Sequence, residues 1–143
     1  MKKILFTLAL SLLMAFSATA QQEVNIKSTQ LPARARQTVQ TYYPKTSIVA
    51  ASKMVFNGRT SYKAAIDEGS FMFFDASGNW NMARSYDGLP DKIVPAKIRK
   101  YVSDYHEGQL IVEIQKLRRT YRITLTDGTS LEFYLNGNFY GFR

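Results

Sequence analysis

Few residues in this chain of 143 residues have side chains that could do chemistry. The chain contains no cysteine, which excludes a cysteine nucleophile and a thiolate metal site. The one histidine, His106, lies close to Asp104 and Glu107 in the sequence. The group falls at the predicted end of a helix, where solvated capping is favoured over coordination. We therefore predict no metal site and no cofactor.

Serine and carboxylate side chains do not form a catalytic pattern either. The members of a Ser-His-Asp triad are present, but the Gly-x-Ser-x-Gly turn that exposes such a serine is absent. Glycoside hydrolysis needs two acids that converge in a cleft. Most acids here fall in predicted turns, where bonds from side chain to backbone explain them. These acids are Asp67, Glu68, Asp75, Asp87 and Asp127. With no glycine-rich phosphate loop either, we predict that the protein is not an enzyme.

The first twenty residues have the pattern of an export signal. Lys2 and Lys3 supply a positive start, residues 4–16 are a largely apolar run, and Ala18 to Ala20 form a small-residue cleavage site. A membrane-spanning helix needs about 20 apolar residues, so this run is too short to be one. We predict cleavage after Ala20 and a mature protein that is periplasmic or secreted and not membrane-spanning.

Basic residues offer another chemistry, the binding of anions. The formal net charge is +8, and it falls by two when Lys2 and Lys3 are removed. A dense basic strip crosses one predicted hairpin. It consists of Lys116, Arg118, Arg119 and Arg122. Such charge attracts nucleic acid, which an exported protein rarely meets, so an anionic glycan, a lipid headgroup or an acidic protein is the better candidate. A solvated strip that keeps the protein soluble is the equal alternative.

A repeated unit must position these side chains. Residues 62–80 recur without a gap as residues 121–139, with five of the nineteen positions identical. A repeat of this kind fixes the architecture to which any site belongs. The residues that precede it, 21–30, are polar and are expected to be loose or weakly paired. The predicted boundaries are a signal peptide at 1–20, a leader at 21–30, repeat one at 31–88 and repeat two at 89–143, the repeats together forming one domain at 31–143.

Each repeat is predicted to be a short helix followed by three or four antiparallel strands. Each opens with Leu-Pro, at Leu31 and Leu89, and proline suits a first helical turn. We expect Pro95 to start the regular part of the second helix. The apolar stripe of this helix is Val94, Ile98, Tyr101, Val102 and Tyr105. After each helix apolar and polar residues alternate, which is typical of strands with one buried face.

The alternation also predicts which strand residues face the core. In repeat two, Leu131 and Phe133 alternate with polar residues and are expected to be buried. Their counterparts in repeat one are Met72 and Phe74. The same parity therefore assigns the residues between them to the other face of the sheet.

That other face is predicted to be a binding surface. It would carry Phe71 and Phe73, together with Lys63, Arg122 and Tyr134. If helices cover only one face of the sheet, these aromatic side chains are exposed and rimmed by charge, as binding surfaces are. The alternative is that a loop, the leader or a second copy of the chain covers them.

Several motifs in this order resemble a known family. They are the Leu-Pro opening, Tyr-Tyr-Pro at residues 42–44, a Tyr-x-x-x-(Ile/Leu)-x-x-Gly hairpin and a Phe-x-x-x-Gly-Asn-(Trp/Phe) ending. Over residues 31–143 the chain resembles the PepSY-like, beta-lactamase-inhibitor-like exported proteins of Bacteroidota. The resemblance implies an α+β fold, in which two tandem helix-plus-antiparallel-strands repeats form one antiparallel sheet with helices on one face. It is similar in outline to a secreted beta-lactamase inhibitor that grips its target with the concave sheet face.

Two hypotheses follow for the function. The first is a noncatalytic exported binding module that holds a protein or peptide of the cell envelope on its open sheet face, with inhibition as one outcome. The alternative is an envelope protein that binds an anionic glycan or lipid headgroup through the basic hairpin strip. Neither involves nucleic acid, and an enzyme ranks third.

Overall fold

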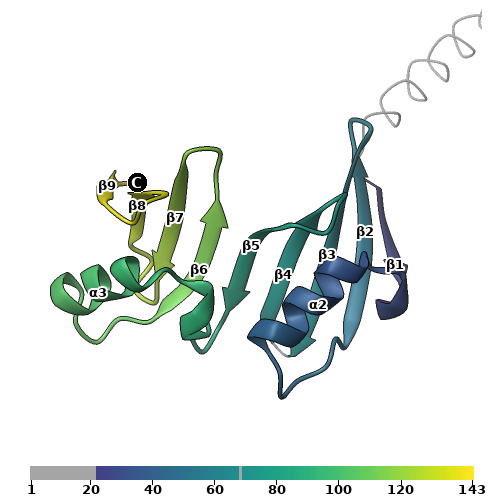
Figure 1. Cartoon of the computed structure of the whole chain (residues 1–143), viewed down its shortest axis with the longest axis horizontal. Coiled ribbons are helices and arrows are strands. Elements are labelled where there is room, and N and C mark those ends of the chain that lie inside the picture. Colours follow the sequence, from purple (N-terminus) through teal and green to yellow (C-terminus); the bar gives the residue numbers. More distant parts are fainter. Residues whose placement is uncertain (1–21, 68) are drawn as a thin grey trace, which may run out of the picture.

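The computed structural model describes residues 22–67 and 69–143. The predicted signal peptide at residues 1–20 lies outside these ranges. The described chain is an α+β fold with two α-helices and one antiparallel sheet of nine strands (Figure 1). Every strand pairs with its neighbour in the sequence, so the strand order runs from β1 to β9 without a crossover.

Four strands follow each α-helix. The helices are α2 (Ala33–Tyr42) and α3 (Ala96–Tyr105), with short 3-10 helices η2 (Ser28–Gln30) and η3 (Asp91–Ile93) before them. The strands are β1 (Gln22–Ile26), β2 (Ala50–Phe56), β3 (Arg59–Asp67), β4 (Ser70–Asp75), β5 (Trp80–Ser85), β6 (Ile111–Lys116), β7 (Thr120–Leu125), β8 (Ser130–Tyr134) and β9 (Phe139–Phe142). No helix in the part of the chain that the structure describes is long and apolar enough to cross a membrane.

Proline starts both helices. Pro32 and Pro95 occupy the N-cap positions of α2 and α3. Proline fits there because its ring fixes φ and because the first turn of a helix has no use for the missing N–H group. The expectation that Pro95 begins the regular part of the second helix is confirmed, since α3 starts at Ala96 after the 3-10 turn of η3.

The leader is more ordered than its polar sequence suggests. Residues 22–26 form the edge strand β1, which pairs with β2 over five residues. The expectation of a loose or weakly paired segment is therefore wrong for these residues. Most of β1 is exposed, so backbone pairing with β2 holds most of it in place, and only Ile26 packs against the core.

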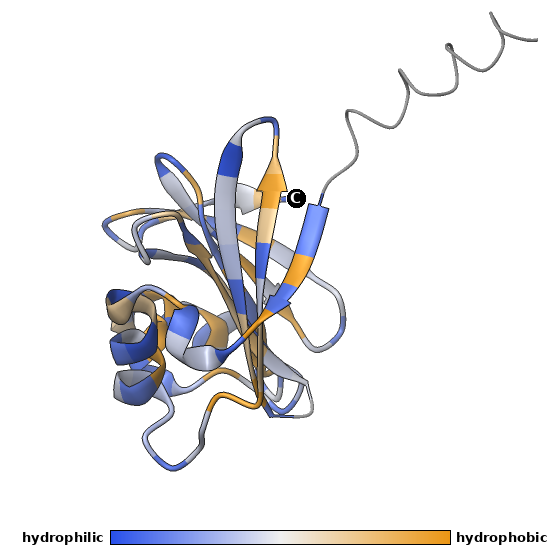
Figure 2. Cartoon of the chain, turned by 90° about the vertical axis from the view of Figure 1, so that its right-hand side faces the viewer, coloured by the Kyte–Doolittle hydropathy of each residue, from blue (hydrophilic) through white to orange (hydrophobic). Residues whose placement is uncertain are grey.

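Both helices lie on one side of the sheet in two views at right angles (Figures 1 and 2). The helices contribute Ala35, Val39, Ile98 and Val102 to the core. Alternate strand residues meet them, and the predicted core positions Met72, Phe74, Leu131 and Phe133 are all 0% exposed. The predicted strand parity is therefore confirmed in both halves of the sheet.

Tyr105, the last residue of the predicted apolar stripe, is not buried with the rest of the stripe. Its side chain is 70% exposed, because α3 ends at this residue and Tyr101, one turn earlier, already covers the sheet. The Tyr101 ring stacks on Phe139 of β9 with centroids 4.6 Å apart, and Tyr105 packs on the outer side of Tyr101 at 4.7 Å.

Each helix also rests against a turn between strands. A Cβ atom at Gly78, between β4 and β5, would lie 2.8 Å from the Cβ of Pro32. One at Gly137, between β8 and β9, would lie 2.9 Å from the Cβ of Lys97. Both glycines have left-handed φ angles, +85° and +89°. Only glycine combines this backbone conformation with so close an approach, so these turns fix the start of each helix on the sheet.

Candidate functional site

Two rows of side chains cross the sheet face that points away from the helices. Residues directly opposite each other on paired strands share a face, so the register defines each row. The Phe73 row runs from β3 to β8 as Lys63, Phe73, Met82, Gln115, Arg122 and Glu132. The Phe71 row runs beside it as Ala65, Phe71, Arg84, Glu113, Thr124 and Ser130. We call this surface the open face. Strands lie about 4.8 Å apart, so each row is about 24 Å long.

The β3 and β4 part of the open face carries an aromatic pair. The rings of Phe71 and Phe73 meet edge to face with centroids 5.5 Å apart. The Lys63 ammonium lies 4.8 Å from the first ring and 5.7 Å from the second. Both phenylalanines are half-buried instead of fully exposed as expected, because the rings cover each other and Lys63 covers both. The described part of the leader does not cover them, since β1 extends the edge of the sheet.

A hollow lies on each side of the aromatic pair. The smaller, about 150 Å³, includes Lys63 and Ala65 in its lining, and Ala65 is directly opposite Phe71. The larger, about 310 Å³, is lined by Arg84, which is opposite Phe71 on the other side. The other residues lining the larger hollow are Tyr86, Val112, Thr124, Leu125, Thr126 and Gly128. Side chains of a bound segment therefore have room beside the two rings.

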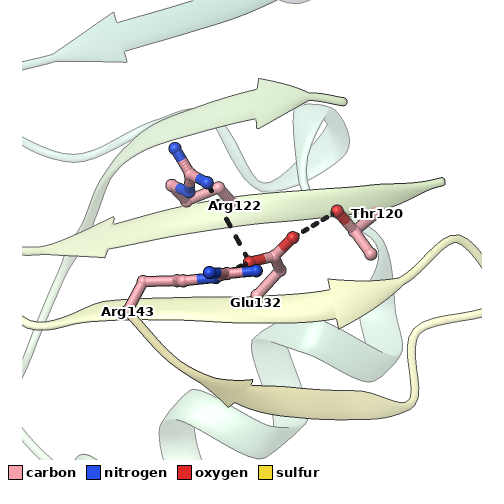
Figure 3. Close-up of polar contacts among 4 residues, drawn as sticks. All are labelled: Thr120, Arg122, Glu132 and Arg143. Carbon is pink, nitrogen blue, oxygen red and sulfur yellow. Dashed lines mark hydrogen bonds and ion pairs between the residues drawn. The ribbon is translucent and has the colours of Figure 1, made fainter. Parts of the chain in front are cut away.

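The part of the open face from β5 to β9 carries paired charges. Arg84 Nη1 lies 3.1 Å from Glu113 Oε2. Glu132 Oε2 accepts a hydrogen bond from Arg143 Nε at 2.5 Å, and Arg122 Nη2 lies 4.0 Å from the same oxygen (Figure 3). Thr120 Oγ1 donates to the other oxygen, Oε1, at 2.6 Å. We call the group of Thr120, Arg122, Glu132 and Arg143 the Glu132 cluster.

The acids of this region lie beneath the arginines. The side chains of Glu113 and Glu132 are 13% and 6% exposed, whereas those of Arg84, Arg122 and Arg143 are 50%, 36% and 53% exposed. The hydrogen bonds from Thr120 and Arg143 keep the pKa of Glu132 below its usual value. Glu132 is therefore a carboxylate at neutral pH, and the outward charge of this region is positive.

The predicted partner-binding residues all lie on the open face. The register places Lys63 and Arg122 in the Phe73 row. Tyr134 has the same parity as Glu132 on β8 and is opposite Thr120 on β7. Its ring is exposed and packs edge to face on Tyr140 at 5.1 Å.

The basic hairpin strip, in contrast, is divided between the two faces of the sheet. Lys116 has the parity of the buried Ile114 and points to the helix side, with its Nζ 3.8 Å from the centre of the Trp80 ring. Burial there lowers the pKa of Lys116. Arg118 and Arg119 lie in the turn between β6 and β7, and only Arg122 belongs to the open face.

The acids near His106 do not gather into a metal site. Asp104 bonds to Lys100 Nζ at 2.6 Å, and the His106 ring faces the ring of Phe142 at 6.4 Å. Across the described ranges there is no group of three or more histidine, cysteine, aspartate or glutamate side chains that could hold a metal ion.

Sequence reasoning did not include four charged residues of the open face among the partner-binding residues. Arg84 and Glu113 could have been found, because strand alternation places them on the face opposite the core, and the register then brings them level with Phe71. The burial of Glu132 could not, because it depends on Arg143, which reaches Glu132 only once β9 has paired with β8.

Comparisons with known proteins identify relatives by sequence and by fold. Residues 60–140 match the model of a family described as "Putative beta-lactamase-inhibitor-like, PepSY-like". A search of curated proteins finds no match. Among solved structures, the chain is similar to a "putative calcium-regulated periplasmic protein" from Bacteroides thetaiotaomicron, with 25% identity and a TM-score of 0.79 over 85% of this chain and 96% of that one. It is also similar to a "putative periplasmic protein of unknown function" from Bacteroides vulgatus, with 22% identity and a TM-score of 0.77 over 87% and 99% of the two chains.

Proposed function

Because this chain belongs to the PepSY-like, beta-lactamase-inhibitor-like family, we propose that it is a noncatalytic exported module that holds a protein or peptide partner on its open face. The similar structures from Bacteroides are described as periplasmic proteins. Together with the predicted signal peptide, this supports a location outside the cytoplasm after cleavage near Ala20. The proposed partner is a component of the cell envelope.

The aromatic pair on the open face carries this proposal. Phe71 and Phe73 do not belong to the core that the helices cover, yet they lie together on β4, on the open face, with a hollow on each side. Aromatic and arginine side chains dominate the energy of protein interfaces, above all at positions that a partner fully desolvates. The pair and its neighbour Arg84 supply both types within one small area.

We further propose that the two halves of the domain are tandem repeats with different tasks. Phe71 and Phe73 of the first half correspond to Ser130 and Glu132 of the second. The first half then provides the apolar anchors, and the second provides the Glu132 cluster. The helix followed by four strands in each half supports this interpretation.

The alternative, an anionic glycan or lipid headgroup held by Lys116, Arg118, Arg119 and Arg122, has weaker support. A headgroup needs several cations that point the same way. Lys116 and Arg122 point to opposite faces of the sheet, so these four residues do not form one surface.

Photo-crosslinking in the cell envelope tests the proposal. The photoreactive residue p-benzoylphenylalanine replaces Phe73 or Tyr134 on the open face in two variants, and Tyr105, an exposed aromatic residue of α3, in a control. We expect a discrete protein adduct from the two open-face positions and none from the control. Adducts from position 105 alone would place the partner on the helices and contradict the proposal.

A further inference from the structure

We propose that the partner segment is acidic as well as apolar, and that Arg122 receives one of its carboxylates. This inference rests on the proposed function, because it concerns the same open face. It identifies the chemistry of the partner from the way charges are shared within the Glu132 cluster.

Among its side chains, the cluster has one more positive charge than it has carboxylates within the described residues. Arg122 and Arg143 share the single carboxylate of Glu132. Thr120 donates a hydrogen bond to one oxygen of that carboxylate at 2.6 Å, and Arg143 donates one to the other oxygen at 2.5 Å. Arg122 stays 4.0 Å away, which is beyond the range of 2.7–3.2 Å that hydrogen bonds of this type span. The surplus charge therefore resides on Arg122.

Arg122 also has an unused hydrogen-bond donor. Within the described part of the chain, its Nε atom is buried and has no hydrogen-bond partner. A buried donor without an acceptor is unusual in a folded protein. The arginine fork pairs with carboxylates through two parallel N–H···O bonds. About a third of the Arg122 side chain is exposed, and a carboxylate of the partner could reach it there. This carboxylate would balance the surplus positive charge. After a small rotation of the guanidinium it would also accept a hydrogen bond from Nε.

The rest of the open face favours the same chemistry. Arg84 and Arg143 are about half exposed and cover their own acids, so they too present positive charge to a partner. Lys63 adds a cation above the aromatic pair. The net charge is +8 for the whole chain and falls by two when Lys2 and Lys3 are removed, and this positive charge extends the attraction beyond contact distance.

The rows also predict a spacing within the partner. Phe73 and Arg122 are three strands apart in one row, which is about 14 Å. An extended peptide that crosses the strands advances about 3.4 Å per residue. An apolar residue on Phe73 and an acid on Arg122 would therefore be about four residues apart.

Selection from a random library tests this inference without a known partner. Twelve-residue peptides displayed on phage are selected on the full mature protein, and the affinities of the enriched peptides are measured by fluorescence anisotropy. We expect the enriched peptides to contain an acid about four residues from an apolar residue. Arg122→Gln should weaken their binding at least tenfold, whereas Arg118→Gln, the same charge change in the β6–β7 turn, should alter it less than twofold. Arg122→Lys retains the positive charge but lacks the forked guanidinium, so its affinity for the peptides should lie between those of the two glutamine variants. If Arg122→Gln does not fold, Arg122→Lys is used in its place.

The outcomes separate this inference from the proposed function. Enriched peptides without acids, equal effects of Arg122→Gln and Arg118→Gln, or no enrichment at all would each overturn the inference. Where peptides are enriched, loss of their binding in the Phe71→Ser, Phe73→Ser double variant would still support the proposed function, and retained binding would contradict both. Where none is enriched, the photo-crosslinking experiment decides on the proposed function by itself. Vesicles of phosphatidylglycerol provide the last arm. Sedimentation of the protein with them that depends on Arg122, and is absent with phosphatidylcholine, would assign Arg122 to a lipid headgroup and overturn the acidic-peptide inference.

Discussion

Phe133→Ala should strongly destabilise the domain. Phe133 is fully buried and packs edge to face against Tyr101 of α3 at 5.3 Å and Phe139 of β9 at 5.6 Å. Its removal leaves a cavity between Tyr101 and Phe139, where α3 meets the sheet. Truncation of a buried phenylalanine costs about 3–5 kcal/mol, which is a large part of the roughly 5–15 kcal/mol that stabilises a typical domain. The melting temperature should fall by about 10–20 °C.

Urea unfolding followed by circular dichroism measures this loss. The matched control is Tyr105→Ala, which removes an aromatic ring of the same cluster that is largely exposed. Its cost should stay below about 1 kcal/mol, as for most surface substitutions. Equal losses from the two variants, or a loss below about 1 kcal/mol for Phe133→Ala, would refute the assignment of the core to the helix side of the sheet.

Three further predictions concern the turn, the buried acid and the aromatic pair. Gly137→Ala should lower the melting temperature more than Gly58→Ala, because both have positive φ but only position 137 meets another residue closely; equal shifts would show that the helix contact is unimportant. Glu132→Gln should be less stable than the parent at pH 7, and the difference should shrink as the pH falls below about 4.5, because the lowered pKa makes the carboxylate stabilising above that pH and the contribution is lost as it protonates; a difference that is the same at pH 3 would contradict the ion pairing. Phe71→Ser and Phe73→Ser should each cost about 1 kcal/mol in urea unfolding, and a cost equal to that of a core phenylalanine would show that this face is internal.

Strand parity is predictable from the sequence because two local signals agree. Apolar residues at every second position mark the buried face, and glycines at the turns fix where each strand reverses. These two signals are enough to place Met72 and Phe74 in the core and Phe71 and Phe73 on the other face, as the burial and the register confirm.

Contacts that depend on long-range pairing are not predictable in this way. The opposite faces of Lys116 and Arg122 are not such a case, because Lys116 has the parity of Ile114 and Arg122 is opposite Gln115, so strand alternation could have separated them. The Glu132 cluster joins β7, β8 and the end of β9, so no local pattern contains it. Tyr105 continues the helical stripe in the sequence, yet the sheet beneath it is already covered by Tyr101.

The rates at which the crosslinked envelope partner binds and dissociates test the central claim most directly. The Phe71→Ser, Phe73→Ser double variant removes the aromatic pair, and Arg118→Glu with Arg119→Glu reverses charge in the β6–β7 turn, away from the open face. We predict that the serine pair speeds dissociation and weakens affinity at least tenfold, since truncated aromatic anchors cost about 2 kcal/mol or more. The charge reversal should slow association and leave dissociation nearly unchanged. Dissociation that is faster after charge reversal and unaffected by the serine pair would contradict the account of the open face as the binding surface.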